Sequence, residues 1–320
     1  MHDDALSYFF YFVLSMNSVK GFIFGIATSV TFGLIPLFTL PLMQAGMAFD
    51  SIIFYRFLFA TLALAGMMKI HHESFRIEKQ DLPVLLVLAV FYTMSSLFLL
   101  WGYGYMGAGV ATTIHFTYPV FVTLLMLFLF REKASWITWL AILMAVYGVA
   151  KLSLKGGELT LDPVGVVIVV LSAVGYASYI TTVNKSRVKT MNSRKLAFYV
   201  FAFTVIILGV KVLLGEGLQP IPDGLCLGNL VLLAVVPTII SNITLVLAVH
   251  HIGGTMTSVL GALEPVTAVC IGAWLFDEAF TWQEGFGIAL ILVAVTLIIL
   301  GKPIQNTLSS VVKLIRPRHA

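Results

Sequence analysis

The segment PVFVTLLMLFLFREKASW at residues 119–136 returns as PVTAVCIGAWLFDEAFTW at residues 265–282. Pro-Val, Leu-Phe, Glu and Trp keep a constant spacing of 146 residues, whereas the Arg-Glu-Lys of the first copy becomes Asp-Glu-Ala in the second. The conserved apolar pattern predicts two related halves. The loss of the basic residues predicts that the two copies end on different sides of a boundary that basic side chains do not cross.

The composition identifies this boundary as a lipid bilayer. Of the 320 residues, 59% are hydrophobic and only 11% are charged, with a mean hydropathy of +1.00, whereas soluble domains carry about 25% charged residues. Residues 21–49, 163–184 and 225–249 hold no charged side chain, and about 20 such residues make a spanning helix because lipid offers the backbone no hydrogen-bond partner. The chain is therefore an integral membrane protein, and its net charge of +4 favours membrane-surface phosphates over nucleic acid.

Ten apolar segments are long enough to cross a bilayer. They are residues 19–43, 51–69, 82–103, 108–130, 136–153, 163–184, 194–211, 225–248, 254–276 and 282–301. Alternating the two sides of the membrane puts fifteen Lys and Arg residues on the side of the N-terminus, three on the other side, and Arg56 inside the second span. Because basic residues in short loops stay in the cytoplasm, both termini are predicted to be cytoplasmic.

The repeat comprises five spans, an odd number, so its second copy enters the membrane from the other side. This explains why the basic residues of the first copy are absent from the second. Two further matches support the repeat: Phe-Tyr-x-Phe-x-Phe at 54–59 recurs at 198–203, and Ser95 recurs as Ser241. The sequence therefore predicts an all-α membrane protein with ten transmembrane helices in two inverted five-helix repeats, an architecture of many secondary transporters.

This pattern resembles the drug/metabolite transporter superfamily, EamA-domain type. The resemblance rests on the ten spans and on Pro-Val…Leu-Phe-x-Glu in the fourth and ninth of them. It divides the chain into an N-terminal extension (1–18), a first EamA-like repeat (19–154), a second, inverted repeat (163–301) and a basic amphipathic C-terminal tail (302–320). It implies a central cavity and transport of small metabolites, commonly amino acids, nucleotide precursors or drugs, often as export. Arg56 resembles the arginine that many members carry in the second helix, and Val200 replaces it in the second half.

Glu264 is a candidate both for binding the substrate and for coupling transport to an ion. It lies about ten residues into the ninth span, roughly 15 Å from its cytoplasmic end, where a charged side chain costs about 2.5–3.5 kcal/mol. A carboxyl group that exchanges its proton at this depth would couple substrate movement to a proton. The structural alternative is that Glu264 forms a hydrogen bond inside a kink made by Pro265.

Other polar side chains inside the spans are candidates for substrate binding: Arg56, Tyr92, His115, Tyr118, Tyr176, Tyr179 and Asn242. Arg56 keeps its charge, so it would anchor a substrate carboxylate or form a buried ion pair, with Glu264 as the candidate partner. His115 and Tyr118 share one helix face, and Tyr118 is the repeat equivalent of Glu264. A histidine here would relay protons or simply pack, and the tyrosines and Asn242 would line a cavity or bond between helices.

Several signals predict how the helices bend, approach and end. Pro119, Pro237 and Pro265 break helical hydrogen bonds in mid-membrane and are candidate hinges. A stripe of small residues at intervals of four predicts close packing inside the protomer or at a dimer face; its members are Gly21, Gly25, Ser29 and Gly33.

Caps are expected at Asp50, Asp162, Asn192 and in the capping box 281–284. Glu132 and Glu278 suit the dipole of the following helix, with a gate role left open, and Trp101, Tyr103, Tyr105, Trp136, Trp139, Trp274 and Trp282 are predicted to form an interfacial belt.

The sequence thus predicts a secondary active transporter of a small polar metabolite in a bacterial inner (plasma) membrane, working as an exporter by alternating access. Alternatives are an intramembrane enzyme or receptor, or a lipid-carrier flippase, although no familiar catalytic motif favours an enzyme. The histidine pairs 71–72 and 250–251 diverge and lack further ligands, so neither a metal site nor a cofactor is predicted. Substrate, coupling ion and the choice between monomer and homodimer stay open. Translation is hypothesised to begin at Met16 rather than Met1.

Overall fold

A computed structural model of the chain describes residues 16–131, 136–155, 158–159, 161–215, 217–278 and 281–315. The hypothesis about translation concerns residues 1–15 and lies outside this range, as does Glu132. The elements are α2 (Met16–Gly33), α3 (Ile35–Gln44), α4 (Phe49–Ile70), α5 (Leu82–Tyr103), α6 (Ala108–His115), α7 (Tyr118–Phe130), α8 (Trp136–Ser153), β1 (Leu154–Lys155), β2 (Glu158–Leu159), α9 (Pro163–Lys185), the 3₁₀ helix η1 (Arg187–Thr190), α10 (Ser193–Leu214), α11 (Gly224–Ala234), the π-helix η2 (Val235–Ile240), α12 (Ser241–Leu260), α13 (Leu263–Leu275) and α14 (Trp282–Ile315).

The described residues contain helices for all ten predicted spans. Seven are long and apolar enough to cross a membrane: Val19–Gln44, Phe49–Ile70, Leu82–Tyr103, Ala108–Phe130, Pro163–Lys185, Ser193–Leu214 and Gly224–Ala248. Three shorter apolar helices match the fifth, ninth and tenth predicted spans: Trp136–Lys151, Leu263–Leu275 and Trp282–Leu297. The prediction of an all-α membrane protein is confirmed. The only strands among the described residues are β1 and β2, which form a small antiparallel hairpin.

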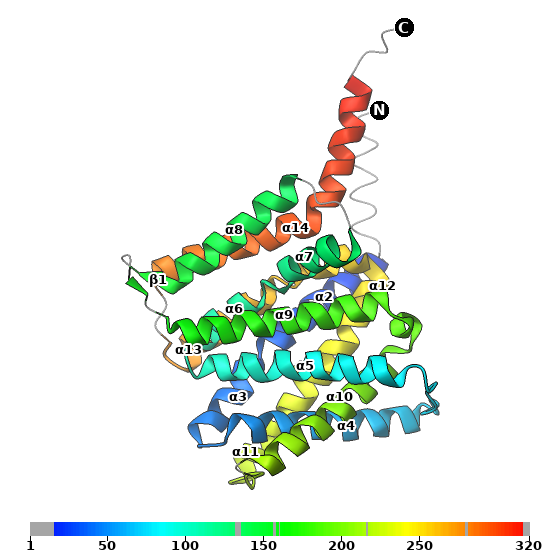
Figure 1. Cartoon of the computed structure of the whole chain (residues 1–320), viewed down its shortest axis with the longest axis vertical. Coiled ribbons are helices and arrows are strands. Elements are labelled where there is room, and N and C mark those ends of the chain that lie inside the picture. The colour runs from blue at the N-terminus through cyan, green and yellow to red at the C-terminus, as the bar shows by residue number, and fades with distance from the viewer. Residues whose placement is uncertain are drawn as a thin grey trace.

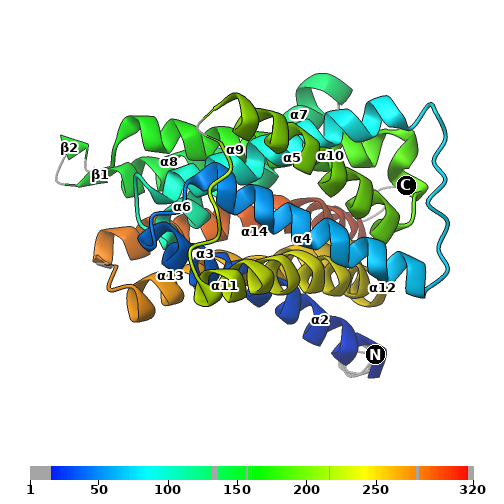
Figure 2. The same cartoon turned by 90° about the horizontal axis from the view of Figure 1, so that it is seen from below.

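The helices of the two halves are interleaved rather than segregated. Figure 1 shows α8 and α14 side by side along one edge of the bundle, α5 beside α9, and α4, α10 and α11 at the other edge. In the view from below in Figure 2, α5 and α9 again lie side by side. The principal packing pairs are α2 with α12, α5 with α9, α4 with α10, α6 with α13, and α8 with α14. Exchanging the first five spans for the last five turns the first two pairs into each other and maps α4 with α10, and α8 with α14, onto themselves, as a twofold axis between the repeats requires. The pair of α6 with α13 is not its own equivalent, because α13 corresponds to α7 in the repeat.

Hydrogen bonds repeat this reciprocity at atomic detail. Thr28 Oγ1 donates to the Ser241 carbonyl oxygen at 2.7 Å, and Ser172 Oγ donates to the Ser95 carbonyl oxygen at 2.6 Å. Thr28 and Ser172 are 144 residues apart, and Ser95 and Ser241 are 146 apart. Tyr55 Oη donates to the carbonyl of Gln219 at 2.9 Å, and the equivalent Tyr199 Oη donates to the carbonyl of Phe75. The repeat spacing in the sequence is therefore a spatial relation between the two halves.

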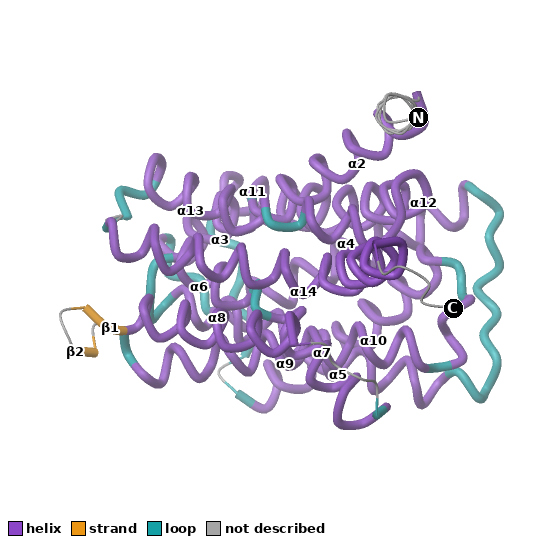
Figure 3. The backbone as a smooth tube through the Cα atoms, turned by 90° about the horizontal axis from the view of Figure 1, so that it is seen from above, coloured by secondary structure: helices purple, strands orange, loops and turns teal. Residues whose placement is uncertain are grey.

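Loops gather at the two ends of the bundle, as Figure 3 shows. We call the end that holds the loop 71–81 and the connection 186–192 the basic end, and the end that holds the loop 104–107 and residues 276–278 the opposite end. At the basic end, Arg187 pairs with Glu78 and Asp81, and Arg194 pairs with Glu73, so the loop 71–81 is tied to the second half. At the opposite end, Lys211 pairs with Asp50.

The fourth and ninth spans are each broken into two helices, which corrects the prediction of continuous, kinked spans. The first break lies at 116–117 between α6 and α7, and the second at 261–262 between α12 and α13. Pro119 and Pro265 stand in the first turns of α7 and α13, where a missing N–H costs little because the first turn has unbonded N–H groups anyway. These prolines therefore begin half-helices instead of interrupting long ones. Pro237 lies inside η2.

The small-residue stripe on α2 packs inside the protomer. A Cβ atom added to Gly21 would meet His251 and Ile252, one added to Gly25 would meet Leu260, and one added to Gly33 would meet the backbone of α13. Thr28 contacts Ser241 and Gly21 lies against Ile252, so the first part of α12 runs antiparallel to α2. Leu260 lies back beside Gly25, so the chain reverses direction within α12. The turn predicted between the eighth and ninth spans therefore lies inside α12.

Other predictions for helix ends have mixed outcomes. Asp162 and Asn192 cap α9 and α10 as expected, and the capping box 281–284 forms, with Glu284 accepting from the N–H of Thr281 at 2.7 Å. Asp50 is not a cap, since α4 begins one residue before it. Residues 302–315 continue α14, and Figure 1 shows this last part turned across the direction of the other helices.

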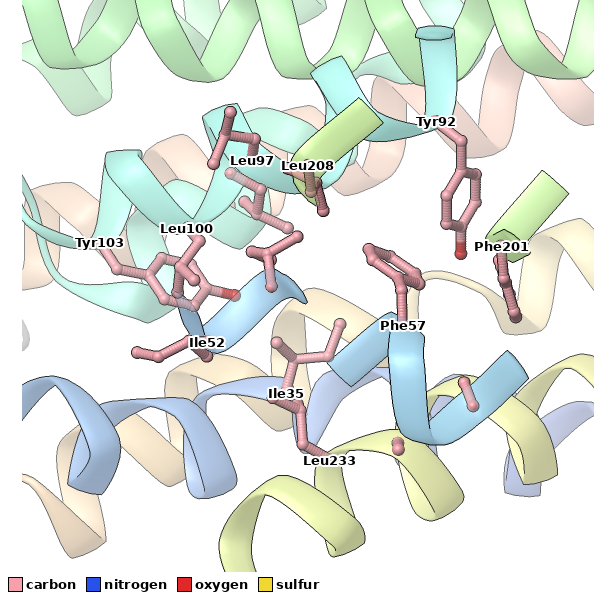
Figure 4. Packing of buried hydrophobic residues seen from close by; sticks show 14 of the residues in the cluster. Ile35, Ile52, Phe57, Tyr92, Leu97, Leu100, Tyr103, Phe201, Leu208 and Leu233 are labelled. Atoms are coloured by element: carbon pink, nitrogen blue, oxygen red, sulfur yellow. The ribbon is translucent and has the colours of Figure 1, made fainter. Parts of the chain in front are cut away.

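The core between the two halves is aromatic and aliphatic. Figure 4 shows Phe57, Tyr92 and Phe201 from three different helices pointing toward one another, with ring centroids 5.2 to 5.6 Å apart. Tyr103 also belongs to this core: it is only 7% exposed, and its hydroxyl lies 3.1 Å from Thr112 Oγ1. The prediction that Tyr103 forms part of the interfacial belt is wrong, because a buried hydroxyl partner is available to it.

Candidate functional site

A small cavity lies at the centre of the bundle, where helices of both halves face each other. Its walls are Phe32, Ile35, Arg56, Tyr92, Ser95, Ser96, Leu99, His115, Tyr176 and Glu264. Its volume is about 40 Å³, which suffices for a water molecule, whereas sites for metabolite-sized ligands measure about 300–1,000 Å³. The central cavity of this structure is therefore smaller than a metabolite-sized ligand requires.

Arg56 stands between this cavity and a larger one. Its side chain lines the central cavity, and its Nε donates to Thr238 Oγ1 at 2.9 Å. Thr238 in turn lines a cavity of about 470 Å³ that reaches Met191 and Arg194 at the basic end. Arg56 is 5% exposed, and a cation buried at membrane depth marks a pathway or a substrate site more often than a packing position.

Thr238 holds the Arg56 side chain because Pro237 removes one backbone hydrogen bond beside it. Pro237 has no N–H, so the Leu233 carbonyl lacks its usual partner one turn later. Thr238 Oγ1 donates to that carbonyl at 2.9 Å and accepts the hydrogen bond from Arg56. Asn242, one turn further on, donates to the Thr238 carbonyl at 2.5 Å and lines the larger cavity. The orientation of Arg56 therefore depends on Thr238, whose own position in the π-helix η2 depends on Pro237.

Glu264 reaches the central cavity from the first turn of a half-helix. It is the second residue of α13, and its N–H donates to the Gly261 carbonyl at 2.9 Å. The N-terminus of a helix carries a partial positive charge, which favours a carboxylate there. Among the ion pairs between described residues, none joins Glu264 to Arg56. Both side chains therefore line one cavity without a direct ion pair between them.

His115 is held by a chain of two buried hydrogen bonds. Its Nδ1 lies 2.9 Å from Ser172 Oγ, and Ser172 Oγ donates to the Ser95 carbonyl at 2.6 Å. The imidazole packs 5.6 Å from the ring of Tyr176 and 6.0 Å from that of Tyr118. Because α6 ends at His115, the side chain occupies the break between the two half-helices of the fourth span.

Tyrosines form a continuous wall beside the cavity. The ring centroids of Tyr118 and Tyr176 are 4.7 Å apart with perpendicular planes, and those of Tyr92 and Tyr179 are 5.1 Å apart. Such edge-to-face pairs are favourable because the positive ring edge meets the negative ring face. Tyr118 and Tyr179 support the wall from behind, whereas Tyr92 and Tyr176 line the cavity.

The family model of the EamA-like transporter family matches residues 19–154 and 163–300, once in each half. The chain belongs to the EamA-like transporter family. A Synechocystis sp. protein named "Uncharacterized transporter sll1319" is 25% identical over 193 residues, which is 59% of this chain and 58% of that protein. Escherichia coli (strain K12) "Uncharacterized inner membrane transporter YedA" is 26% identical over 199 residues, 61% of this chain and 63% of the relative. The matches thus span about three fifths of each relative's length.

The same fold occurs in a solved crystal structure. That chain superimposes with a TM-score of 0.63 at 15% identity, over 87% of this chain and 96% of the other. The likeness in structure extends over both halves of this EamA-like protein, beyond the part that the sequence matches cover. At this level of identity it establishes the fold alone.

In this EamA-like chain, five of the eight predicted binding residues line the central cavity: Arg56, Tyr92, His115, Tyr176 and Glu264. Tyr118 and Tyr179 pack behind them, and Asn242 lines the neighbouring cavity. Sequence reasoning missed two hydroxyl residues that position these side chains: Ser172, which contacts His115, and Thr238, which contacts Arg56. Small hydroxyl side chains are common in membrane helices, and only the repeat match at Ser95 hinted at one of these contacts.

Glu278 makes a contact that its sequence position does not predict. Its carboxylate accepts hydrogen bonds from the backbone N–H groups of Ala108, at 2.7 Å, and Gly109, at 3.4 Å. It therefore caps α6 in the other half, not the helix that follows it. Among the described residues, no three His, Cys, Asp or Glu side chains gather in a way that could hold a metal ion.

Proposed function

We propose that this chain is a secondary active transporter that moves a small polar metabolite across a bacterial inner membrane by alternating access. In this proposal it is an exporter with both termini in the cytoplasm. The observation that carries the proposal is the central cavity, which two inverted repeats enclose and which buries Arg56 and Glu264 without pairing them. The family and the name of the E. coli relative, an inner membrane transporter, support the membrane assignment.

The packing supports two groups of helices that would move against each other. One group contains α5, α6, α7 and α9, and the symmetric group contains α2, α3, α11, α12 and α13. The central cavity lies between these groups, and the cavity of about 470 Å³ leads from the basic end to Thr238 beside Arg56. The substrate would enter by this larger cavity, and separation of the groups would enlarge the central site. Pro119, Pro237 and Pro265 would serve as hinges, because each stands at a break or a π-helix.

The roles of the polar residues follow from their chemistry. Arg56 would bind an anionic group of the substrate, because its guanidinium keeps its charge and presents several donors. Glu264 would bind a cationic or hydrogen-bond-donating group, or exchange a proton as the substrate leaves. Tyr92 and Tyr176 would contact the apolar part. A zwitterionic metabolite such as an amino acid satisfies all three contacts.

Transport is tested with purified protein in proteoliposomes. Counterflow of a panel of ¹⁴C-labelled amino acids and nucleosides is measured, with and without a proton gradient. Arg56→Gln is expected to raise KM for an anionic or zwitterionic probe by about 10- to 100-fold, since a charge-assisted hydrogen bond contributes about 1.5–3 kcal/mol. Glu264→Gln is expected to abolish the response to the proton gradient, and Glu284→Gln, in the capping box of α14, serves as the control. Absence of counterflow for every probe would contradict the substrate class, and unchanged gradient dependence in Glu264→Gln would remove the coupling role.

Orientation is tested by labelling single cysteines in whole cells. The native Cys226 and Cys270 are first replaced by alanine. Lys189 is exposed at the basic end, and Leu225 is 80% exposed at the opposite end. Lys189→Cys is expected to react with an impermeant maleimide only after the cells are broken, and Leu225→Cys before. The reverse result would place the termini outside the cytoplasm.

A further inference from the structure

Ser172 connects a helix–helix contact to the one histidine that lines the central cavity. Its hydroxyl is fully buried and touches two groups, the Ser95 carbonyl oxygen at 2.6 Å and His115 Nδ1 at 2.9 Å. A serine hydroxyl has one hydrogen to donate, and a carbonyl oxygen can only accept. The hydrogen therefore lies between Ser172 and Ser95, and the oxygen of Ser172 is left as an acceptor toward His115.

This arrangement selects one tautomer of the histidine. Because Ser172 Oγ can only accept from the imidazole, Nδ1 of His115 must carry a hydrogen. A neutral imidazole has one N–H, so its Nε2 is then a bare acceptor. No described residue forms a hydrogen bond with Nε2, and His115 lines the central cavity. Nε2 is thus the ring nitrogen left for a ligand.

The inverted repeat shows that the helix contact itself does not need the histidine. In the other half, Thr28 makes the equivalent bond to Ser241 at 2.7 Å. The residue that corresponds to His115 there is Gly261, which has no side chain to bond. The two hydroxyl-to-carbonyl bonds are therefore alike. Only the Ser172 hydroxyl, on α9, has a second partner, His115, which lines the central cavity.

We propose that Ser172 is a positioning residue that holds His115 as a hydrogen-bond acceptor for an N–H or O–H donor of the transported molecule. This consequence for transport rests on the proposed function, whereas the tautomer does not. The cavity would then offer one strong donor, Arg56, and two acceptors, His115 Nε2 and Glu264. A substrate that lacks a donating group, such as an ammonium, amide or hydroxyl, would leave the acceptors unpaired and bind less well.

Nuclear magnetic resonance tests the tautomer without any substrate. Full-length protein with ¹⁵N-labelled histidine is recorded in lipid nanodiscs at alkaline pH, where the imidazole is neutral. The chain has seven histidines, and His115→Gln identifies the signals of His115. The wild type is expected to show a protonated Nδ1 and a bare Nε2. Ser172→Ala is expected to shift His115 toward the tautomer that is protonated at Nε2, and Ser172→Thr to restore the wild-type pattern, because threonine fills the equivalent position in the other half.

Thr28→Val is the matched control, since it removes the equivalent helix–helix bond but leaves His115 untouched. It is expected to keep the wild-type tautomer even if it lowers stability. A wild-type spectrum with the hydrogen on Nε2 would overturn the inference, as would a tautomer change in Thr28→Val equal to that in Ser172→Ala. The first result would show that Ser172 does not accept a hydrogen bond from His115 Nδ1, and the second that the tautomer responds to general packing and not to Ser172.

Transport supplies the second readout. For a labelled amino acid that the wild type carries, Ser172→Ala is expected to raise KM by about 2- to 10-fold, the loss expected for one hydrogen bond. Thr28→Val is expected to change KM less than 2-fold. Equal KM values for Ser172→Ala and the wild type would overturn the role in binding. If the wild type transports no amino acid, the proposed function fails in its present form while the spectra still decide the tautomer.

Discussion

The approach of α2 to α13 is close enough that one methyl group should disturb it. A Cβ atom on Gly33 would lie 2.5 Å from Thr267 Cβ and 2.6 Å from the Glu264 carbonyl oxygen. Ordinary contacts begin near 3.4 Å, so Gly33→Ala requires the two helices to separate by about 0.9 Å. Overpacking of this kind costs about 1–3 kcal/mol. Neither contact can relax by turning a flexible side chain, because both atoms lie on or next to the backbone.

Gly66 provides a matched control on α4, where an added Cβ would meet nothing within 4 Å. Both substitutions gain helix propensity, up to about 1 kcal/mol, so the difference between the two variants isolates the packing cost. At about 2–4 °C per kcal/mol, Gly33→Ala should melt about 2–12 °C below Gly66→Ala when intrinsic tryptophan fluorescence is followed in detergent. Equal melting temperatures would show that α2 and α13 are farther apart than the structure has them, and would remove the argument that the stripe is internal packing.

Three further predictions address contacts between the halves. Glu278→Gln should weaken the cap on α6 by about 0.5–2 kcal/mol, so amide hydrogen exchange at the start of α6 should accelerate. The control Glu284→Gln, which alters the capping box of α14, should leave exchange at the start of α6 unchanged. Acceleration there in both variants would refute the cap between the two halves. Thr238→Val should lower stability by about 1–3 kcal/mol because it removes the partner of Arg56 and of a backbone carbonyl, whereas Thr238→Ser should melt like the wild type. Tyr55→Phe should cost about 0.5–1.5 kcal/mol for its single bond to the loop after α10, and an unchanged melting temperature would contradict that bond.

The broken spans show where sequence reasoning stopped short. Pro119 and Pro265 were visible, but a continuous apolar stretch on both sides predicts a kinked helix as readily as two half-helices. The choice depends on whether neighbouring helices satisfy the freed backbone groups, which is a property of packing. Tyr103 is a similar case, since its place near a span end predicts the interfacial belt, whereas Thr112 and the surrounding core supply a buried partner for its hydroxyl.

The sequence by itself determined that this chain crosses a membrane, roughly where it does so, and that two halves are related by inversion. These conclusions depend on the cost of placing charge and unbonded backbone in lipid, which acts on each segment wherever it lies in the fold. Tertiary structure alone decided that Glu278 caps α6, that Thr238 holds Arg56 and that Ser172 holds His115. Hydrogen bonds act only over about 3 Å, so residues separated by tens to hundreds of positions become partners only after the helices have packed.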